Sequence, residues 1–272
     1  MPEVIYVPNP YRRPGLTVGH LLTPYTDAAA TRALASVRSD PVYAPTPLRA
    51  RPATARRLGL ADVQLKDEGV RMRWHDLGSF KVLGILAALA GAAAPCIRGA
   101  HTVVCASDGN YGRALAWAAA RRGLLARVFI PASVREGTAA AIRAQGGEAV
   151  RVPGGYDAAM VAAKQAADAD GVVELSDTGV PGAEVVPTAV SVGYTQIAEE
   201  CLAAWPAAGG WPTHVFVPVG VGGLAAGFIA GLRARLGPAG MPRVIAVEPR
   251  SANGLMASLR AGTLASSFGP AD

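Results

Sequence analysis

The sequence predicts an α/β protein in which parallel strands alternate with helices. Four short apolar runs have the pattern of strands, at residues 102–106, 127–130, 149–152 and 172–175. Helical segments separate them, at residues 113–122, 136–144 and 158–167. Continuous apolar strands joined by helices are typical of parallel sheets that are covered on both faces. We therefore expect a small α/β domain over residues 84–182.

A second block of the same kind follows a longer amphipathic helix at residues 188–205. Its strands lie at 214–219 and 244–247, and its helices at 224–236 and 253–260. The first 83 residues contain a helix at 27–38, an extended segment at 43–48 and a strand at 63–68. We expect residues 1–83 and 183–272 to form a larger second domain, so that the protein has two lobes.

The composition restricts the class of protein. Of the 272 residues, 51% are hydrophobic and 17% are charged, which indicates a folded globular chain. The net charge of +6 and the isoelectric point near 9.5 come from basic residues scattered as pairs, without a basic cluster. This pattern argues against nucleic-acid binding and favours a mild attraction for anionic small molecules.

The cysteines and histidines indicate the cellular compartment of the protein and whether it has a metal site. Cys96, Cys105 and Cys201 have no Cys-x-x-Cys spacing, so we expect reduced thiols in a cytoplasmic protein. The four histidines are isolated, and no metal site is predicted. The N-terminal residues lack the apolar core of a signal peptide, and no apolar stretch is long enough to span a membrane.

The stretch Gly78-Ser79-Phe80-Lys81-Val82-Leu83-Gly84 opens an apolar helix predicted at residues 82–94. We expect Ser79 to be the N-cap, which places Lys81 in the first turn beside the positive end of the helix dipole. Burial and positive potential both favour the neutral form of an amine, and Schiff-base chemistry requires a neutral lysine. The alternative is a lysine that simply extends from the helix start into water.

The loop Ser107-Asp108-Gly109-Asn110-Tyr111-Gly112, called here the Asn110 loop, follows the strand at 102–106. Open α/β sheets bind ligands at the carboxyl ends of their strands. Two glycines let backbone amides approach a ligand closely, and a carboxylate and an amide side chain accompany them. An ordinary glycine turn is the alternative.

The loop Gly220-Val221-Gly222-Gly223, called here the glycine loop, opens the helix at 224–236 and predicts a phosphate site made of backbone amides. Gly220-x-Gly222-x-x-Ala225 also fits the dinucleotide fingerprint, with Glu248 where an acid could bind ribose. A nicotinamide-dependent dehydrogenase is therefore an alternative. It leaves Lys81 and the Asn110 loop unexplained.

Together these segments resemble the fold-type II pyridoxal-phosphate enzymes, the superfamily of tryptophan synthase β and the threonine dehydratases. Within it, four features resemble the diaminopropionate ammonia-lyases. They are Ser79-Phe80-Lys81-x-Leu83-Gly84, Asp108-Gly109-Asn110-x-Gly112-Arg113, Asp177-Thr178 ten residues before Pro187, and Gly193-Tyr194-Thr195.

The resemblance implies a role for each matching residue. Lys81 would hold pyridoxal 5'-phosphate and move the α-proton, and Asn110 would hydrogen-bond the pyridine hydroxyl. Gly220, Val221, Gly222 and Gly223 would donate amides to the phosphate. Asp108 and Asp177 would be the acid–base pair. Substrate contacts would come from Ser107, Asp108, Gly109 and Tyr111.

The implied reaction is α,β-elimination of ammonia from a small amino acid such as 2,3-diaminopropionate, giving pyruvate and ammonia, in a homodimer. A serine/threonine dehydratase and a relative that binds the cofactor without turnover are the alternatives. Three segments depart from the resemblance: Tyr111 replaces a histidine, Val180-Pro181-Gly182-Ala183 replaces Trp-Glu-Gly-Tyr, and Trp74-His75-Asp76 lengthens a loop. Such relatives also continue past the position of Asp272, so we expect an incomplete large domain with an exposed apolar face.

Overall fold

The computed structural model describes residues 6–9, 19–179 and 182–265. Its largest sheet has four strands in the order β5-β4-β3-β6, and every pair in it is parallel. The strands are β3 (Thr102–Ala106), β4 (Leu125–Pro131), β5 (Glu148–Val152) and β6 (Val172–Glu174). The predicted parallel arrangement is confirmed, and each strand lies within two residues of its predicted bounds.

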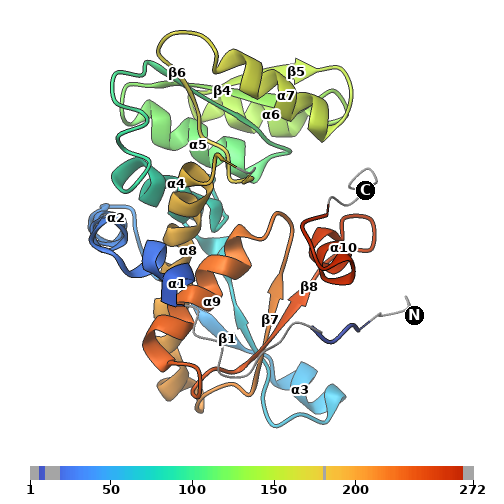
Figure 1. Cartoon of the computed structure of the whole chain (residues 1–272). Helices are drawn as coiled ribbons and strands as arrows, with labels where there is room; N and C mark the ends of the chain where they lie inside the picture. The colour runs from blue at the N-terminus through green and yellow to red at the C-terminus, as the bar shows by residue number, and fades with distance from the viewer. Residues whose placement is uncertain (1–5, 10–18, 180–181, 266–272) are drawn as a thin grey trace.

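Helices cover both faces of this sheet, as the apolar strands require. They are α5 (Asn110–Ala120), α6 (Glu136–Ala144) and α7 (Tyr156–Ala166). Val104, Ala106 and Phe129 form one cluster with alanines of α7, whereas alternate residues such as Val103 and Cys105 belong to the main core. The alternation follows from the two-residue period of a strand. Figure 1 shows this sheet and its helices as the upper lobe.

The lower lobe in Figure 1 contains two separate pairs of strands. β1 (Leu48–Ala50) pairs antiparallel with β2 (Gln64–Lys66), and β7 (His214–Pro218) pairs in parallel with β8 (Arg243–Val247). The helices here are α1 (Gly19–Thr26), α2 (Ala28–Ser39), α3 (Pro52–Leu58), α9 (Gly223–Leu236) and α10 (Gly254–Ala261). The sequence did not predict α1, α3 or β1. Each has eight residues or fewer, which is too short for a clear hydrophobic period.

Two central helices, α4 (Lys81–Ala90) and α8 (Val185–Ala204), fix the positions of the functional loops. A Cβ on Gly193 would lie 2.2 Å from the carbonyl oxygen of Leu83, and a Cβ on Gly84 would lie 2.6 Å from Val190. Only glycine permits this approach of α8 to α4. A Cβ on Gly227 would likewise lie 2.1 Å from the carbonyl oxygen of Ser191, so α9 packs closely on α8 as well.

As a result, α8 packs closely against the N-terminal half of α4 and the N-terminal half of α9. Figure 1 shows α8 extending from the upper lobe into the lower one. A single hydrophobic cluster contains residues of α4, α5, α8 and α9, so the core is continuous between the lobes. The domain division at residues 84 and 182 stays a prediction.

The outer face of the β7–β8 pair is apolar and exposed. Phe216 on β7 is 66% exposed and Val247 on β8 is 49% exposed. Two large apolar side chains of this pair are thus exposed, and the incomplete large domain from which the exposed face was expected stays a prediction.

A buried set of charges, called here the closed network, joins residues before α4 to α8. It contains Lys66, Glu68, Arg71 and Glu200, two positive and two negative side chains. Arg71 is fully buried and donates to both carboxylate oxygens of Glu200 at 2.8 Å. It also donates to both oxygens of Glu68, at 2.7 and 2.9 Å. Bidentate pairing of this kind is the strongest form of charged hydrogen bond.

Neutral groups also donate hydrogen bonds to the closed network. The hydroxyl of Tyr43 donates to Glu200 at 2.8 Å, and the amide of Thr46 donates to it at 3.1 Å. Burial would raise the pKa of Glu200, but Arg71 and Lys66 outweigh it and lower that pKa to about 2. Glu200 therefore carries its negative charge near neutral pH.

Candidate active site

Helix α4 begins at Lys81 itself. The capping position is Phe80, which provides no side-chain cap. Ser79 is therefore not the N-cap that the sequence predicts. Its hydroxyl instead accepts a hydrogen bond from the amide of Lys81 at 3.3 Å, which satisfies one free N–H of the first turn.

The ammonium of Lys81 faces a carboxylate and two aromatic rings. Its Nζ lies 2.5 Å from Oδ2 of Asp177, 5.4 Å from the centre of the Phe80 ring and 5.6 Å from that of Tyr111. The side chain of Lys81 is 24% exposed and that of Asp177 is 8% exposed. The lysine is thus enclosed on several sides but still open to a ligand, and it does not simply extend into water.

Strand order brings Asp177 to this position. β6 pairs in parallel with β3, so residues that follow the two strands lie at the same edge of the sheet. Asp177 follows β6 and Asp108 follows β3, as the sequence predicts. Asp108 is exposed, partial burial raises the pKa of its carboxyl, and no hydrogen bond or ion pair joins it to another described residue. Asp177 is therefore the carboxylate in contact with Lys81.

The Asn110 loop is held in shape by Ser107. Its buried hydroxyl accepts hydrogen bonds from the amides of Gly109, at 3.1 Å, and Gly112, at 2.9 Å. The amides of Asp108, Asn110 and Tyr111 have no partner among the described residues, and they precede or begin α5. Free amides at a helix N-terminus suit a carboxylate. The Ser107 oxygen already accepts two hydrogen bonds, and the free amides that the loop offers belong to its backbone.

Tyr111 is buried and its hydroxyl is used within the protein. It donates to the carbonyl oxygen of Leu175 at 3.0 Å, and burial raises its pKa well above the ordinary value. This bond ties the start of α5 to the end of β6, just before Asp177. Of the departing segment at 180–183, Val180 and Pro181 lie outside the described residues.

The glycine loop is open where a phosphate would lie. Gly222 has φ +90°, which favours glycine, whereas Gly220 has no positive φ, and a Cβ added to it would meet no atom within 4 Å. The absence of a side chain at Gly220 is thus not required by the protein around it. The amides of residues 220–223 have no partner among the described residues, and they lead into α9. These features suit a phosphate group.

Side chains from α8 and α1 support the glycine loop. The hydroxyl of Ser191 donates to the carbonyl oxygen of Gly223 at 2.7 Å, and Tyr25 hydrogen-bonds Ser191 at 3.2 Å. Tyr194, one turn along α8, is buried with a hydroxyl that has no hydrogen-bond partner among the described residues. Its ring contacts Phe80 edge to face, with centroids 5.2 Å apart.

Glu248 is not free to bind a ribose. Its two carboxylate oxygens accept hydrogen bonds from the amides of Leu255, at 2.8 Å, and Met256, at 2.9 Å, at the start of α10. The carboxylate therefore caps a helix. This position removes the acid on which the dehydrogenase alternative depends.

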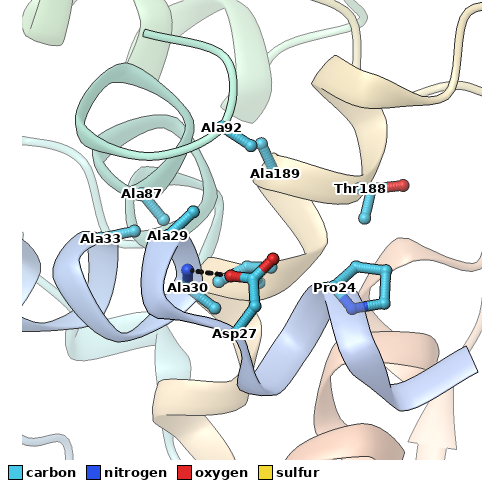
Figure 2. A pocket seen from close by; sticks show the side chains of 10 residues that line it. Pro24, Asp27, Ala29, Ala30, Ala33, Ala87, Ala92, Thr188 and Ala189 are labelled. Atoms are coloured by element: carbon cyan, nitrogen blue, oxygen red, sulfur yellow. Dashed lines mark hydrogen bonds between the residues drawn. The ribbon is translucent and has the colours of Figure 1, made fainter. Parts of the chain in front are cut away.

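A small cavity elsewhere in the fold has no catalytic groups. It has a volume of about 50 Å³ and lies where α2, α4 and α8 meet (Figure 2). Most of its lining residues are alanines. Asp27 supplies its carboxylate, which accepts a hydrogen bond from the amide of Ala30 at 2.7 Å as the N-cap of α2.

Metal sites and membrane spans have no candidate within the described ranges. No cluster of three or more histidine, cysteine, aspartate or glutamate side chains has the arrangement of a metal site there. Among the helices of the described part of the chain, none has the length and apolar character needed to cross a membrane.

Comparison with known proteins agrees with the resemblance found in the sequence. A family model described as "Pyridoxal-phosphate dependent enzyme" matches residues 40–269. The chain belongs to this family. The pyridoxal 5'-phosphate predicted from the three loops is thereby confirmed as the cofactor, and the protein is an enzyme of this class.

Individual relatives include ammonia-lyases and dehydratases. Diaminopropionate ammonia-lyase of Salmonella typhimurium is 32% identical over 95% of this chain and 68% of the relative. A serine dehydratase-like protein of Rattus norvegicus is 32% identical over 84% of this chain and 63% of the relative. The Escherichia coli diaminopropionate ammonia-lyase is 30% identical, and the chain spans 56% of its length.

A solved structure shows the same fold. It is Escherichia coli diaminopropionate ammonia-lyase in complex with an aminoacrylate–pyridoxal-phosphate azomethine reaction intermediate. The TM-score is 0.83 at 27% identity, over 94% of this chain and 67% of the other. The two-lobed fold-type II architecture expected from the sequence is therefore confirmed.

Only one lysine of the chain has surroundings that suit the cofactor. The chain contains three, Lys66, Lys81 and Lys164. Lys66 belongs to the closed network, and Lys164 is exposed on α7. Lys81 combines partial exposure with the neighbouring carboxylate of Asp177.

Proposed function

We propose that the protein eliminates ammonia from a small amino acid with a β-amino group, such as 2,3-diaminopropionate. Water then converts the remaining three carbons to pyruvate, so one diaminopropionate and one water give one pyruvate and two ammonia. The observation that carries this proposal is the contact of Lys81 with Asp177 at 2.5 Å, between two loops of free backbone amides. The 32% identity to a diaminopropionate ammonia-lyase over 95% of the chain supports the choice of substrate.

Each loop has a separate task. The amides of residues 220–223 would hold the cofactor phosphate, and Asn110 would hydrogen-bond the pyridine hydroxyl. When bound, pyridoxal phosphate supplies a conjugated ring that stabilises negative charge at the α-carbon of an amino acid. The free amides of the Asn110 loop would hold the substrate carboxylate.

The reacting protons belong to Lys81 and the carboxylates. Nζ of Lys81 would take the α-proton, because it is the basic group at the centre of the site. Asp177, in contact with that nitrogen, would exchange a proton with Lys81 and donate one to the leaving amine. Asp108, at the same sheet edge, is the second candidate for this acid–base role.

A serine/threonine dehydratase is the competing proposal, since the serine dehydratase-like relative is also 32% identical. The two reactions differ in the leaving group, an amine or a hydroxyl. The experiment supplies purified protein and cofactor with diaminopropionate, serine or threonine, and measures ammonia and the 2-oxo acid. Ammonia and pyruvate from diaminopropionate in at least about tenfold preference support the proposal, with Lys81→Ala as the inactive control.

The opposite preference contradicts the ammonia-lyase and supports the dehydratase. If the protein binds the cofactor but releases no ammonia from any of the three substrates, it is a relative that binds pyridoxal phosphate without catalysing the reaction.

We further propose a homodimer in the cytoplasm. All three cysteines are unpaired thiols, which fits a reducing compartment, and the apolar face of β7–β8 offers surface for a second subunit. Light scattering of the purified protein tests the dimer, and a molecular mass of one chain contradicts it.

A further inference from the structure

Arg113, in α5, connects the Asn110 loop to the turn that precedes Lys81. Its Nη2 donates to the carbonyl oxygen of Leu77 at 2.7 Å and to Oδ1 of Asn110 at 3.0 Å. Leu77 is buried and lies four residues before Lys81. A single guanidinium nitrogen thus spans two segments that both face the cofactor site.

The chemistry of this contact fixes the orientation of the Asn110 amide. A guanidinium group donates hydrogen bonds and cannot accept them. Asn110 must therefore turn its carbonyl oxygen towards Arg113, and its amide nitrogen is directed away from the arginine. This nitrogen has no partner among the described residues, so it is available as a donor to a ligand.

The surroundings of Arg113 are unusual for an arginine that only stabilises the fold. Arg121 pairs with Asp40 and Arg127 pairs with Glu148, but Arg113 forms no ion pair with a described carboxylate. Its Nε is buried without a hydrogen-bond partner among the described residues. Leaving a buried donor unsatisfied carries a cost in stability. The contact with Asn110 gives a functional reason to keep the residue there.

We propose that Arg113 is a positioning residue for the cofactor. It holds the side-chain nitrogen of Asn110 towards the pyridine hydroxyl and adds positive charge beside that hydrogen bond. The inference rests on the proposed function in two respects: the chain must bind pyridoxal phosphate, and Asn110 must be the residue at the pyridine hydroxyl.

The test is a double-mutant cycle between Arg113 and Asn110. Arg113→Met removes the guanidinium but keeps a stem of similar length, and Asn110→Ala removes the amide. The dissociation constant of pyridoxal phosphate is measured by titrating the cofactor-free protein. The pH dependence of the cofactor absorbance in the visible range is recorded for each variant.

We expect Arg113→Met to raise the dissociation constant about tenfold and to shift the midpoint of the absorbance titration. The double variant should bind no more weakly than Asn110→Ala alone, because Arg113 acts through Asn110. Arg113→Lys, which keeps the charge and can reach one acceptor, should recover part of the affinity. Arg127→Met, at a surface pair with Glu148, is the matched control and should leave affinity and absorbance unchanged.

Three results would overturn the inference. They are an unchanged dissociation constant in Arg113→Met, fully additive effects in the double variant, and a loss of affinity explained by a lower unfolding temperature of the cofactor-free variant. Failure of cofactor binding in the wild-type protein would overturn the proposed function as well. The two failures are therefore distinguishable.

Discussion

Two lysines of this chain each lie 2.5 Å from a buried carboxylate oxygen, Lys66 from Glu200 and Lys81 from Asp177. The carboxylates differ in what else they contact. Glu200 also binds Arg71 through both oxygens and accepts from Tyr43 and Thr46. Asp177 has no second hydrogen-bond partner among the described residues.

The difference would explain why the Lys66–Glu200 pair is structural and the Lys81–Asp177 pair is, as proposed, reactive. In the closed network every strong acceptor is occupied, so neither Lys66 nor Glu200 can exchange its partner without leaving a buried charge unpaired. Lys81 is more exposed than Lys66, at 24% against 13%, and can leave Asp177 for a ligand. Saturation of hydrogen bonds, and not the distance within the pair, separates the two sites.

The largest expected effect is a loss of activity when the carboxylate of Asp177 is removed, because only the Lys81–Asp177 pair, and not the closed network, is proposed to take part in the reaction. Asp177→Asn should lower kcat by about 10²- to 10⁴-fold, the usual contribution of a general acid or base. Its unfolding free energy should change by about 1 kcal/mol or less, since Lys81 keeps access to water. Steady-state kinetics and urea unfolding of the same preparation measure both values. A stability loss as large as the activity loss would remove the distinction between the sites.

Breaking the closed network should lower the stability of the protein and leave its cofactor binding unchanged. Arg71→Met leaves Glu200 and Glu68 buried without their guanidinium partner, which costs about 3–5 kcal/mol of unfolding free energy. Urea unfolding measures the loss. The fraction of folded molecules that carry cofactor on Lys81 should be unchanged, and loss of that cofactor from folded protein would show that the two regions are coupled.

Acid should destabilise the folded protein through Glu200 of the closed network. The pKa of Glu200 is lowered to about 2 from its ordinary value of 4.5, so its contribution is complete above about pH 4.5 and is lost as the pH falls towards 2. The contribution amounts to about 3 kcal/mol. Unfolding free energies between about pH 2.5 and about pH 6 should show this slope in the wild type. In Glu200→Gln the slope should be shallower, and an equal slope would be evidence against the assignment.

A much smaller change in unfolding free energy is expected when Tyr194 is replaced. Its buried hydroxyl has no partner among the described residues, so Tyr194→Phe removes an unsatisfied group and keeps the ring that packs on Phe80. The unfolding free energy of the cofactor-free protein should stay within about 0.5 kcal/mol of the wild type or rise. A loss of about 1 kcal/mol or more would indicate a partner for this hydroxyl.

The site around Lys81 could be predicted from the sequence better than the closed network, and the reason is physical. Lys81, Asp108 and Asp177 each follow a recognisable strand or start a recognisable helix, and parallel strands bring such ends to one edge. The pairing of Arg71 with Glu200 joins residues 129 positions apart and depends on how α8 packs, which no local pattern records. The orientation of Asn110 by Arg113 was missed for a related reason, because an i, i+3 spacing on α5 does not show which atoms meet.

The identity of the lysine that binds the cofactor can be measured directly. The protein is loaded with pyridoxal phosphate, reduced with borohydride, digested and analysed by peptide mass spectrometry. We expect a single reduced adduct on Lys81, with Lys66 and Lys164 unmodified, and none in Lys81→Ala. An adduct on Lys66 or Lys164, or its persistence in Lys81→Ala, would contradict the assignment of Lys81 as the reactive lysine.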